Sequence, residues 1–149
     1  MATTHAPSLH EILTKTHVLS PANLKHAEDL QKSSPKKLIR ILVDEGLMSE
    51  KDLMLLLSEE LEIPVLDLAA YRVESKVLKM IPRKIAERYE VIPVSQIGPI
   101  LTLAMSDPLD VTAMDDIRKL THCTVRPVIA TSRDIQTAIE NYYAEGKTK

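Results

Sequence analysis

The fold is decided by a stretch that occurs twice, as residues 8–31, SLHEILTKTHVLSPANLKHAEDLQ, and as residues 37–60, KLIRILVDEGLMSEKDLMLLLSEE. A shift of 29 residues overlays the two copies and aligns five identities: Leu9 with Leu38, Ile12 with Ile41, Leu13 with Leu42, Ser20 with Ser49, and Leu24 with Leu53. Each copy places apolar residues at i, i+3 and i+4 and follows them with a capping serine, which predicts a helix, a tight turn and a second helix. We therefore expect a tandem duplication, although two amphipathic helix pairs could share these identities for packing reasons alone.

Local signals predict where these helices begin and end. Ser20-Pro21 combines a capping hydroxyl with proline at the first helical position. Ser33-Ser34-Pro35 predicts the start of the third helix, and Gly46 predicts its end. The run Ser49–Asp52 is similar to a capping box and predicts the start of a helix that carries Leu53, Leu56 and Leu57.

The sequence pattern changes at Ile63-Pro64, where helical periodicity gives way to alternating strands and helices. We expect strands at 64–68, 91–94, 100–105 and 123–129, and helices that begin near Pro82, Asp110 and Thr131. The predicted fold class is α+β, a helical tandem-repeat subdomain followed by a small βαββαβα sandwich. The predicted boundaries are 1–62 for the helical subdomain, 63–143 for the sandwich and 144–149 for a tail or linker.

Composition excludes several classes of function. The chain of 149 residues has no Trp, no Phe and four Tyr, so it has few aromatic platforms on which bases could stack. Its net charge is −2 and its basic residues are scattered, the densest cluster being Lys32–Lys37, so we expect no nucleic acid partner. No apolar run is long enough to span a membrane and the first residues do not read as a secretory signal, so we expect a cytoplasmic protein without direct membrane insertion.

No catalytic or cofactor site is expected. The three glycines stand at 46, 98 and 146. Gly146-Lys147-Thr148 matches the end of a phosphate-binding loop, but Asn141 stands where that loop requires its first glycine. The dinucleotide fingerprint is excluded by the same shortage of glycine. We therefore predict that the chain is not an enzyme, has no catalytic residues and binds no cofactor.

Histidine and cysteine do not form a recognisable metal or nucleophile pattern. His10, His17 and His26 are separated by a predicted turn, and no carboxylate or cysteine completes a ligand set, so we predict solvent-facing or turn histidines and no metal site. Cys123 follows His122 in a predicted strand, where adjacent side chains point to opposite faces. We expect Cys123 to be a small core residue.

Four strings in the chain resemble a known family, the N-terminal domain of type II secretion and type IV pilus assembly ATPases. They are LVDEGLMSEKDLMLLLSEELEIPVLDL at 42–68, MIPRKIAERYEVIPV at 80–94, LTLAMSDPLDVTAMDDIRKLT at 101–121 and VRPVIATSRDIQTAIENYY at 125–143. The resemblance covers about residues 8 to 143. In this family the domain precedes a linker and a hexameric ATPase core.

The resemblance implies two alternative uses of the helical repeat. Some members bind cyclic di-GMP through a doubled motif with Arg-Leu-Gly, a turn glycine and a final Gln, whereas others dock on an inner-membrane platform protein. Here the motif positions read Ser8-Leu9-His10, His17 and Gln31, then Lys37-Leu38-Ile39, Gly46 and Glu60. The candidate ligand positions are Leu9, Gln31, Lys37, Leu38 and Gly46, but both arginines and three of the four glycines are replaced. Lys supplies only a point charge in place of the guanidinium fork, and a side chain in place of Gly obstructs close approach to the backbone.

We therefore predict a non-catalytic regulatory or partner-docking domain, with cyclic di-GMP sensing as the alternative. The implied partners are the inner-membrane platform protein or the motor ATPase, which would recruit the chain to the membrane. In the run from Leu53 to Leu57, five apolar residues go round more than one helical turn. If Leu53, Leu56 and Leu57 face the core, Met54 and Leu55 face another surface, either a neighbouring part of the chain or a partner.

Overall fold

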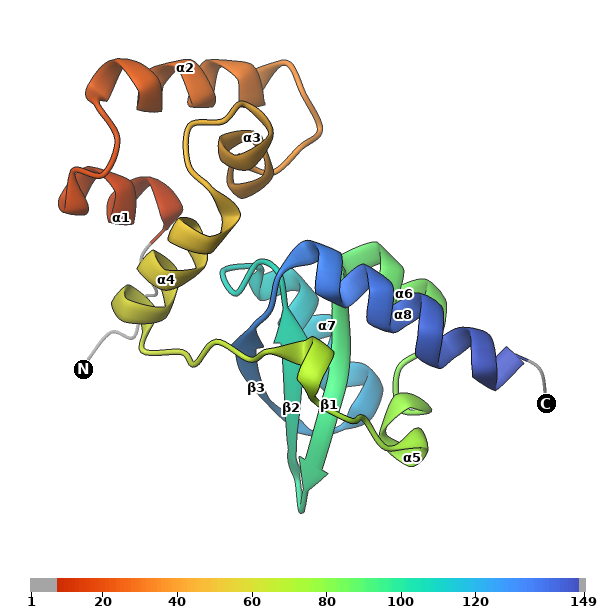
Figure 1. Ribbon diagram of the computed structural model, residues 1–149. Coiled ribbons are helices and arrows are strands. Elements are labelled where there is room, and N and C mark those ends of the chain that lie inside the picture. The colour runs from red at the N-terminus through yellow and green to blue at the C-terminus, as the bar shows by residue number, and fades with distance from the viewer. Residues whose placement is uncertain (1–7, 148–149) are drawn as a thin grey trace. The chain divides into compact units, whose positions relative to one another are not determined.

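The chain divides into two compact units, Met1–Leu53 and Met54–Lys149. The computed structural model describes residues 8–147, with side chains as far as residue 143 (Figure 1). The first four helices are α1 (Leu9–Thr16), α2 (Pro21–Lys32), α3 (Leu38–Asp44) and α4 (Glu50–Leu61). The remaining elements are η1 (Leu68–Ala70), α5 (Ser75–Leu78), α6 (Arg83–Tyr89), β1 (Val91–Ile97), β2 (Ile100–Met105), α7 (Val111–Thr121), β3 (Thr124–Ile129) and α8 (Ser132–Lys147).

The helix starts follow from capping side chains. The Ser20 hydroxyl accepts the Asn23 amide at 3.1 Å and begins α2. The Ser49 hydroxyl accepts the Asp52 amide at 3.1 Å and begins α4. The buried apolar residues of the first unit come from all four helices, which explains why two short helix pairs form a core: Leu9, Ile12, Leu13, Ala27, Ile41, Leu42 and Leu53.

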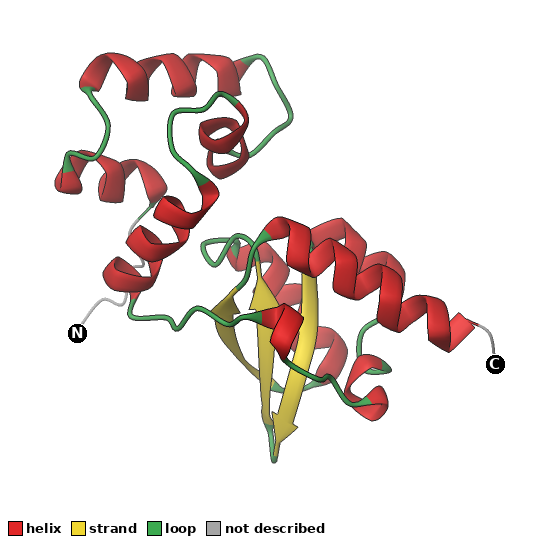
Figure 2. Cartoon of the chain, viewed as in Figure 1, coloured by secondary structure: helices red, strands yellow, loops and turns green. Residues whose placement is uncertain are grey.

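The second unit is built on a three-stranded sheet in the order β1-β2-β3 (Figure 2). β1 pairs antiparallel with β2, and β2 pairs parallel with β3. Residues Val91–Val94 are buried at every position, so both faces of the sheet must be covered. α7 lies behind the sheet and α8 in front of it in this view. The predicted α+β fold class is confirmed.

Several element boundaries differ from the sequence prediction. α3 begins at Leu38 and not at Ser34-Pro35, because Ser33 closes α2 and the Ser34 hydroxyl accepts the Lys36 amide at 3.1 Å. The strand expected at 64–68 is reduced to one parallel bridge between Val65 and Ile129. Pro64 lacks an amide hydrogen, and the chain turns into η1 directly afterwards.

The predicted domain limits can be compared with the structure at residue 144 and at residues 62–63. α8 continues to Lys147, past the expected start of a tail at residue 144. Helical structure gives way to the bridge at Val65 after α4 ends at Leu61, close to the predicted boundary between residues 62 and 63. The two compact units, however, separate inside α4, between Leu53 and Met54. The boundary at 62/63 therefore stays a prediction.

Candidate functional site

The tandem repeat is present in the backbone as well as in the sequence. α1 and α3 begin at Leu9 and Leu38, and α2 and α4 run over Pro21–Lys32 and Glu50–Leu61, so each pair of starts is separated by the 29 residues of the sequence shift. The two capping bonds at Ser20 and Ser49 have the same length, 3.1 Å. The folded chain therefore repeats the helix-turn-helix backbone of the doubled motif.

The turn positions of the motif have left-handed backbone in both copies. His17 has φ 55° and Gly46 has φ 73°. Behind α3 the Gly46 amide donates to Val43 O at 3.1 Å and the Leu47 amide to Leu42 O at 2.9 Å, which is a Schellman motif. Gly46 thus has a complete structural role. His17, directly after α1, also has a left-handed φ, but it carries a side chain that this region disfavours.

The leucines of the motif are the first residues of their helices. Leu9 is buried, and Leu38 is half-buried. Before them, Ser8 forms a capping box with Glu11, whose carboxylate accepts the Ser8 amide at 2.8 Å, whereas Lys37 caps α3 without a side-chain hydrogen bond to the helix. Leu9 is thus anchored in the core and Leu38 partly so, whereas Ser8 and Lys37 before them are both exposed.

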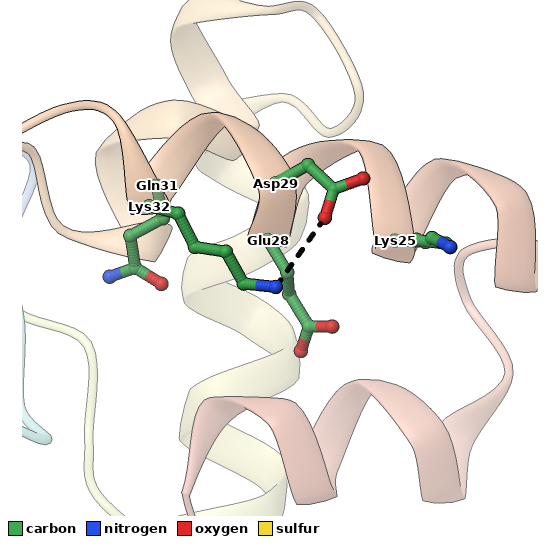
Figure 3. A pocket seen from close by; sticks show the side chains of 5 residues that line it. All are labelled: Lys25, Glu28, Asp29, Gln31 and Lys32. Carbon is green, nitrogen blue, oxygen red and sulfur yellow. Dashed lines mark ion pairs between the residues drawn. The ribbon is translucent and has the colours of Figure 1, made fainter.

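Gln31, the last candidate ligand residue of the first copy, lies in an open hollow of about 540 Å³ along α2 (Figure 3). The hollow is lined by Lys25, Glu28, Asp29, Gln31 and Lys32. Lys32 Nζ lies 3.8 Å from Asp29 Oδ1, so two lysines face two carboxylates and the lining carries no net charge. A neutral lining gives an anionic ligand no electrostatic advantage.

A contact that the sequence did not predict joins α1 to Glu28, one of the residues that line the hollow. His10 Nδ1 pairs with Glu28 Oε2. His10 stands where the motif has its first glycine, so the side chain that replaces glycine is held by an acid in the hollow. The partners are 18 residues apart and on different helices, and helix periodicity gives no signal for such a pair.

The remaining motif residues do not join Gln31 in this hollow. None of Leu9, Lys37, Leu38 and Gly46 is among the residues that line it. No ligand role of the five candidate residues is settled by this geometry, and each stays a prediction.

The helical register of α4 agrees with the predicted apolar faces. Leu53, Leu56 and Leu57 are buried. Met54 is half-buried, and Leu55 is 52% exposed. A half-exposed leucine next to a methionine is a surface that a partner could cover, so Met54 and Leu55 remain the candidate docking residues.

The histidine and cysteine side chains have local roles. His17 and His122 end α1 and α7 in left-handed conformation, and His26 is exposed. The predicted placement of His122 and Cys123 in a strand is wrong: His122 is the C-cap of α7, and β3 begins at Thr124. Cys123 is buried, and Gln96 Nε2 lies 3.6 Å from its sulfur. Among the described residues, no three His, Cys, Asp or Glu side chains are grouped as metal ligands.

The perturbed titratable groups also have structural explanations. Burial raises the pKa of Tyr143 to about 12. A hydrogen bond to Asp116 raises the pKa of Tyr89. A hydrogen bond from Lys36 Nζ at 2.8 Å lowers the pKa of Asp44. These three groups belong to different elements and form no shared acid-base site.

No helix within residues 8–147 combines the length and the apolar character that crossing a bilayer requires.

Comparison with known proteins identifies relatives in pilus and secretion machines. The type IV pilus assembly ATPase PilB of Myxococcus xanthus is 34% identical over 137 residues, which is 92% of this chain and 24% of that protein. The type II secretion system protein E of Xanthomonas campestris is 26% identical over 144 residues, 93% of this chain and 25% of that protein. The chain thus spans about a quarter of the length of these two relatives.

Two solved structures have the same fold. A structure of MshE with cdg (cyclic di-GMP) superposes with a TM-score of 0.79 and 27% identity, over 93% of this chain and all of that chain. The N-terminal domain of XpsE superposes with a TM-score of 0.76 and 23% identity, over 93% of this chain and 99% of that chain. The MshEN domain family matches residues 61–149. The chain belongs to the MshEN domain family and is homologous to the N-terminal domains of type IV pilus and type II secretion ATPases.

Proposed function

We propose that this chain is a non-catalytic regulatory or partner-docking domain of a type IV pilus or type II secretion ATPase system. The observation that carries the proposal is the pairing of His10 with Glu28, because it fills a motif position that ligand binding in the family leaves to glycine. A domain that keeps its fold while its ligand positions change is suited to contact with another protein. The expected partners are the inner-membrane platform protein or the motor ATPase, either of which would bring the chain to the inner membrane from the cytoplasm.

The proposed docking surface is centred on Met54 and Leu55 in α4. Leu55 exposes 52% of its surface, which costs free energy in water and is recovered when a partner covers it. Methionine adapts to partners of different shape because its side chain is unbranched and flexible. We propose the domain limits 1–62 for the helical subdomain that carries this surface, 63–143 for the sandwich, and 144–149 for a tail or linker start into which α8 continues as far as Lys147.

The docking surface is tested with the double variant Met54→Asp/Leu55→Asp. We expect the variant to keep its helical circular dichroism and to lose capture by the cytoplasmic part of the platform protein. Val18→Asp is the matched control, because Val18 is also an exposed apolar residue, 45% exposed, but lies in the turn between α1 and α2. Unchanged capture by the double variant would exclude this surface, and loss of its helical signal would show that the two residues belong to the core.

The second candidate function is binding of cyclic di-GMP, and the likeness to MshE solved with cdg favours it. Leu9, Gln31, Leu38 and Gly46 match the motif. Ser8 and Lys37 replace the two arginines, and neither has the planar fork that binds phosphate or guanine in two places. Glu60 replaces the final Gln of the second copy, which removes a donor and adds negative charge near a dianion. We therefore expect weak or absent binding.

Calorimetric titration with cyclic di-GMP separates the two candidates. Little or no heat is expected from the wild-type chain. Submicromolar affinity that is lost in Gln31→Ala would promote the ligand-sensing function over docking. The control is Thr137→Ala, because Thr137 is exposed on α8, outside the motif and outside the compact unit that contains Gln31.

A non-catalytic role also predicts that this chain does not hydrolyse ATP. Within the sequence no phosphate loop is complete, because Asn141 stands at its first glycine position. We expect no phosphate release above background from chain purified by size exclusion. Turnover that co-elutes with the chain would contradict this proposal.

A further inference from the structure

The residues from Arg72 to Arg88 form a basic segment in a chain whose net charge is −2. The segment covers α5, the turn after it and most of α6. It contains six of the 19 Lys and Arg residues and only two of the 21 Asp and Glu residues. Its cations are Arg72, Lys76, Lys79, Arg83, Lys84 and Arg88. They are spread along the sequence, so no short charge run reveals them.

Most of these cations are exposed, and the fold gains little from them. Arg83 Nε pairs with Glu87 Oε2 at 2.9 Å, and the Arg88 guanidinium lies 5.4 Å from the ring centre of Tyr89. Lys84 is exposed and precedes Arg88 by four residues on α6. Like charges at this spacing face each other on a helix and destabilise it. The position of Lys84 is therefore not explained by the stability of the helix.

The backbone that carries these charges is held firmly by α8. The Tyr142 hydroxyl accepts the Val73 amide at 3.1 Å. The Tyr143 hydroxyl donates to Ile81 O at 2.7 Å, in the turn between α5 and α6. Val73, Val77, Leu78 and Ile81 are buried between these contacts. The cations therefore project from a scaffold that fixes their spacing, which favours recognition of a ligand with a matching pattern of charge.

We propose that residues 72–88 form a docking surface for an acidic polypeptide segment of a partner. Six cations complement carboxylates, whereas Glu74 and Glu87 interrupt them and would select among sequences by repulsion. An anionic bilayer fits less well. Surface-bound membrane segments also insert apolar side chains, and none of the described large apolar residues with substantial exposure lies within 72–88; Tyr71, 36% exposed, is adjacent. This surface is separate from Met54 and Leu55, so it does not depend on the docking surface proposed for α4.

The test uses the whole chain and a fluorescein-labelled oligoglutamate peptide. The variant Lys76→Glu/Lys79→Glu/Lys84→Glu reverses three exposed cations of the segment. The control Lys119→Glu/Arg126→Glu/Arg133→Glu reverses three exposed cations elsewhere in the same unit and changes the net charge by the same amount. We expect the wild type to bind the peptide with an affinity that falls as salt is added. The segment variant should bind about tenfold more weakly, and the control should bind like the wild type.

Each other outcome overturns the proposal. An equal loss in both variants would show that only net charge matters. Binding to phosphatidylcholine vesicles that contain phosphatidylglycerol, without binding to the peptide, would assign the surface to a membrane. Absence of both would show a solvated surface without a ligand. If the triple variant unfolds, the single variant Lys84→Glu replaces it in the binding test. This substitution removes the like-charge pair with Arg88, so the variant should melt no lower than the wild type. Its affinity for the peptide should fall about twofold.

Discussion

At the scale of single residues, the left-handed turn positions of the repeat show how a β-carbon affects the conformational energy of a turn. Gly46 and His17 occupy equivalent places after α3 and α1, with φ 73° and 55°. A side chain with a β-carbon is strained there by about 1–2 kcal/mol, although glycine loses more entropy on folding. The first copy therefore accepts a strained turn that the second copy avoids.

Replacing Gly46 by Ala should lower the free energy of unfolding by about 1 kcal/mol. No atom lies within 4 Å of the added β-carbon, so the cost is conformational and not steric. Urea denaturation measures it, and Glu45→Ala, at the neighbouring position with φ −86°, is the control. His17→Gly should change stability in the opposite direction. Equal stability of Gly46→Ala and the wild type would show that the turn carries no strain.

Tyr143 makes the free energy of unfolding depend on pH in the alkaline range. Burial raises its folded-state pKa from 10.0 to about 12, so the protonated tyrosine stabilises the fold. This stabilisation is complete below pH 10 and is lost as pH rises from 10 toward 12, because the unfolded chain ionises first. We expect the urea midpoint of the wild type to fall over this pH range. The fall should be smaller in Tyr143→Phe, because phenylalanine does not ionise. Tyr89 contributes in the same direction, so the comparison is made again in a Tyr89→Phe background.

At the scale of elements, α6 contains one cation that opposes its stability, Lys84, beside the favourable pair of Arg83 with Glu87 and Arg88 in the last turn. Lys84 lies in its first turn, where the helix dipole favours an acid, and it repels Arg88 four residues later. α7 shows the opposite arrangement, with Arg118 and Lys119 in its last turn and Asp115 Oδ1 at 2.7 Å from Arg118.

Lys84→Glu should therefore raise the free energy of unfolding by about 0.5 kcal/mol, because repulsion becomes an i, i+4 attraction. Lys119→Glu should lower it by a similar amount, since it places an acid near a helix C-terminus and close to two other acids. Thermal melts monitored by circular dichroism compare the two. Destabilisation by both substitutions would show that Lys84 has a structural partner.

The elements that the sequence predicted well are those whose signals are local. Ser20 and Ser49 act as caps, and Gly46 ends α3, because each signal and its backbone partner lie within one turn. Prediction failed where two local signals compete. Pro35 follows Ser34 as proline follows a cap, yet the Ser34 hydroxyl bonds to Lys36 and delays the helix to Leu38. The strand expected from Pro64 fails because strand pairing depends on a distant partner, and only Val65 reaches Ile129.

At the scale of the whole molecule, the repeat and the change of pattern after residue 62 could be predicted from the sequence, but the candidate site could not. Gln31 was singled out through the family motif. The His10–Glu28 pair that shapes its surroundings joins residues 18 apart on two helices. The basic segment is not apparent in the sequence, because its cations are interspersed with apolar residues that are buried in the structure. Packing, which brings together distant side chains, decides both features.

The position of the domain boundary can be measured by truncation. The core of the second unit begins at Leu68 and includes no residue of α4. We expect residues 63–149 to unfold cooperatively, with a midpoint close to that of residues 54–149. If the longer fragment is clearly more stable, α4 belongs to the sandwich and the boundary lies between Leu53 and Met54.

The bridge at Val65 decides how a pull on the chain would be transmitted. The Leu66 amide donates to Ile129 O at 2.8 Å and the Ile129 amide to Pro64 O at 2.9 Å, which are the bonds that fasten the segment after α4 to the edge of β3. Tension applied at residue 62 acts first on these two bonds and then on the buried side chain of Leu68. We expect two edge hydrogen bonds to yield at a lower force than a packed core, so the segment between α4 and η1 should extend under load before the sheet unfolds.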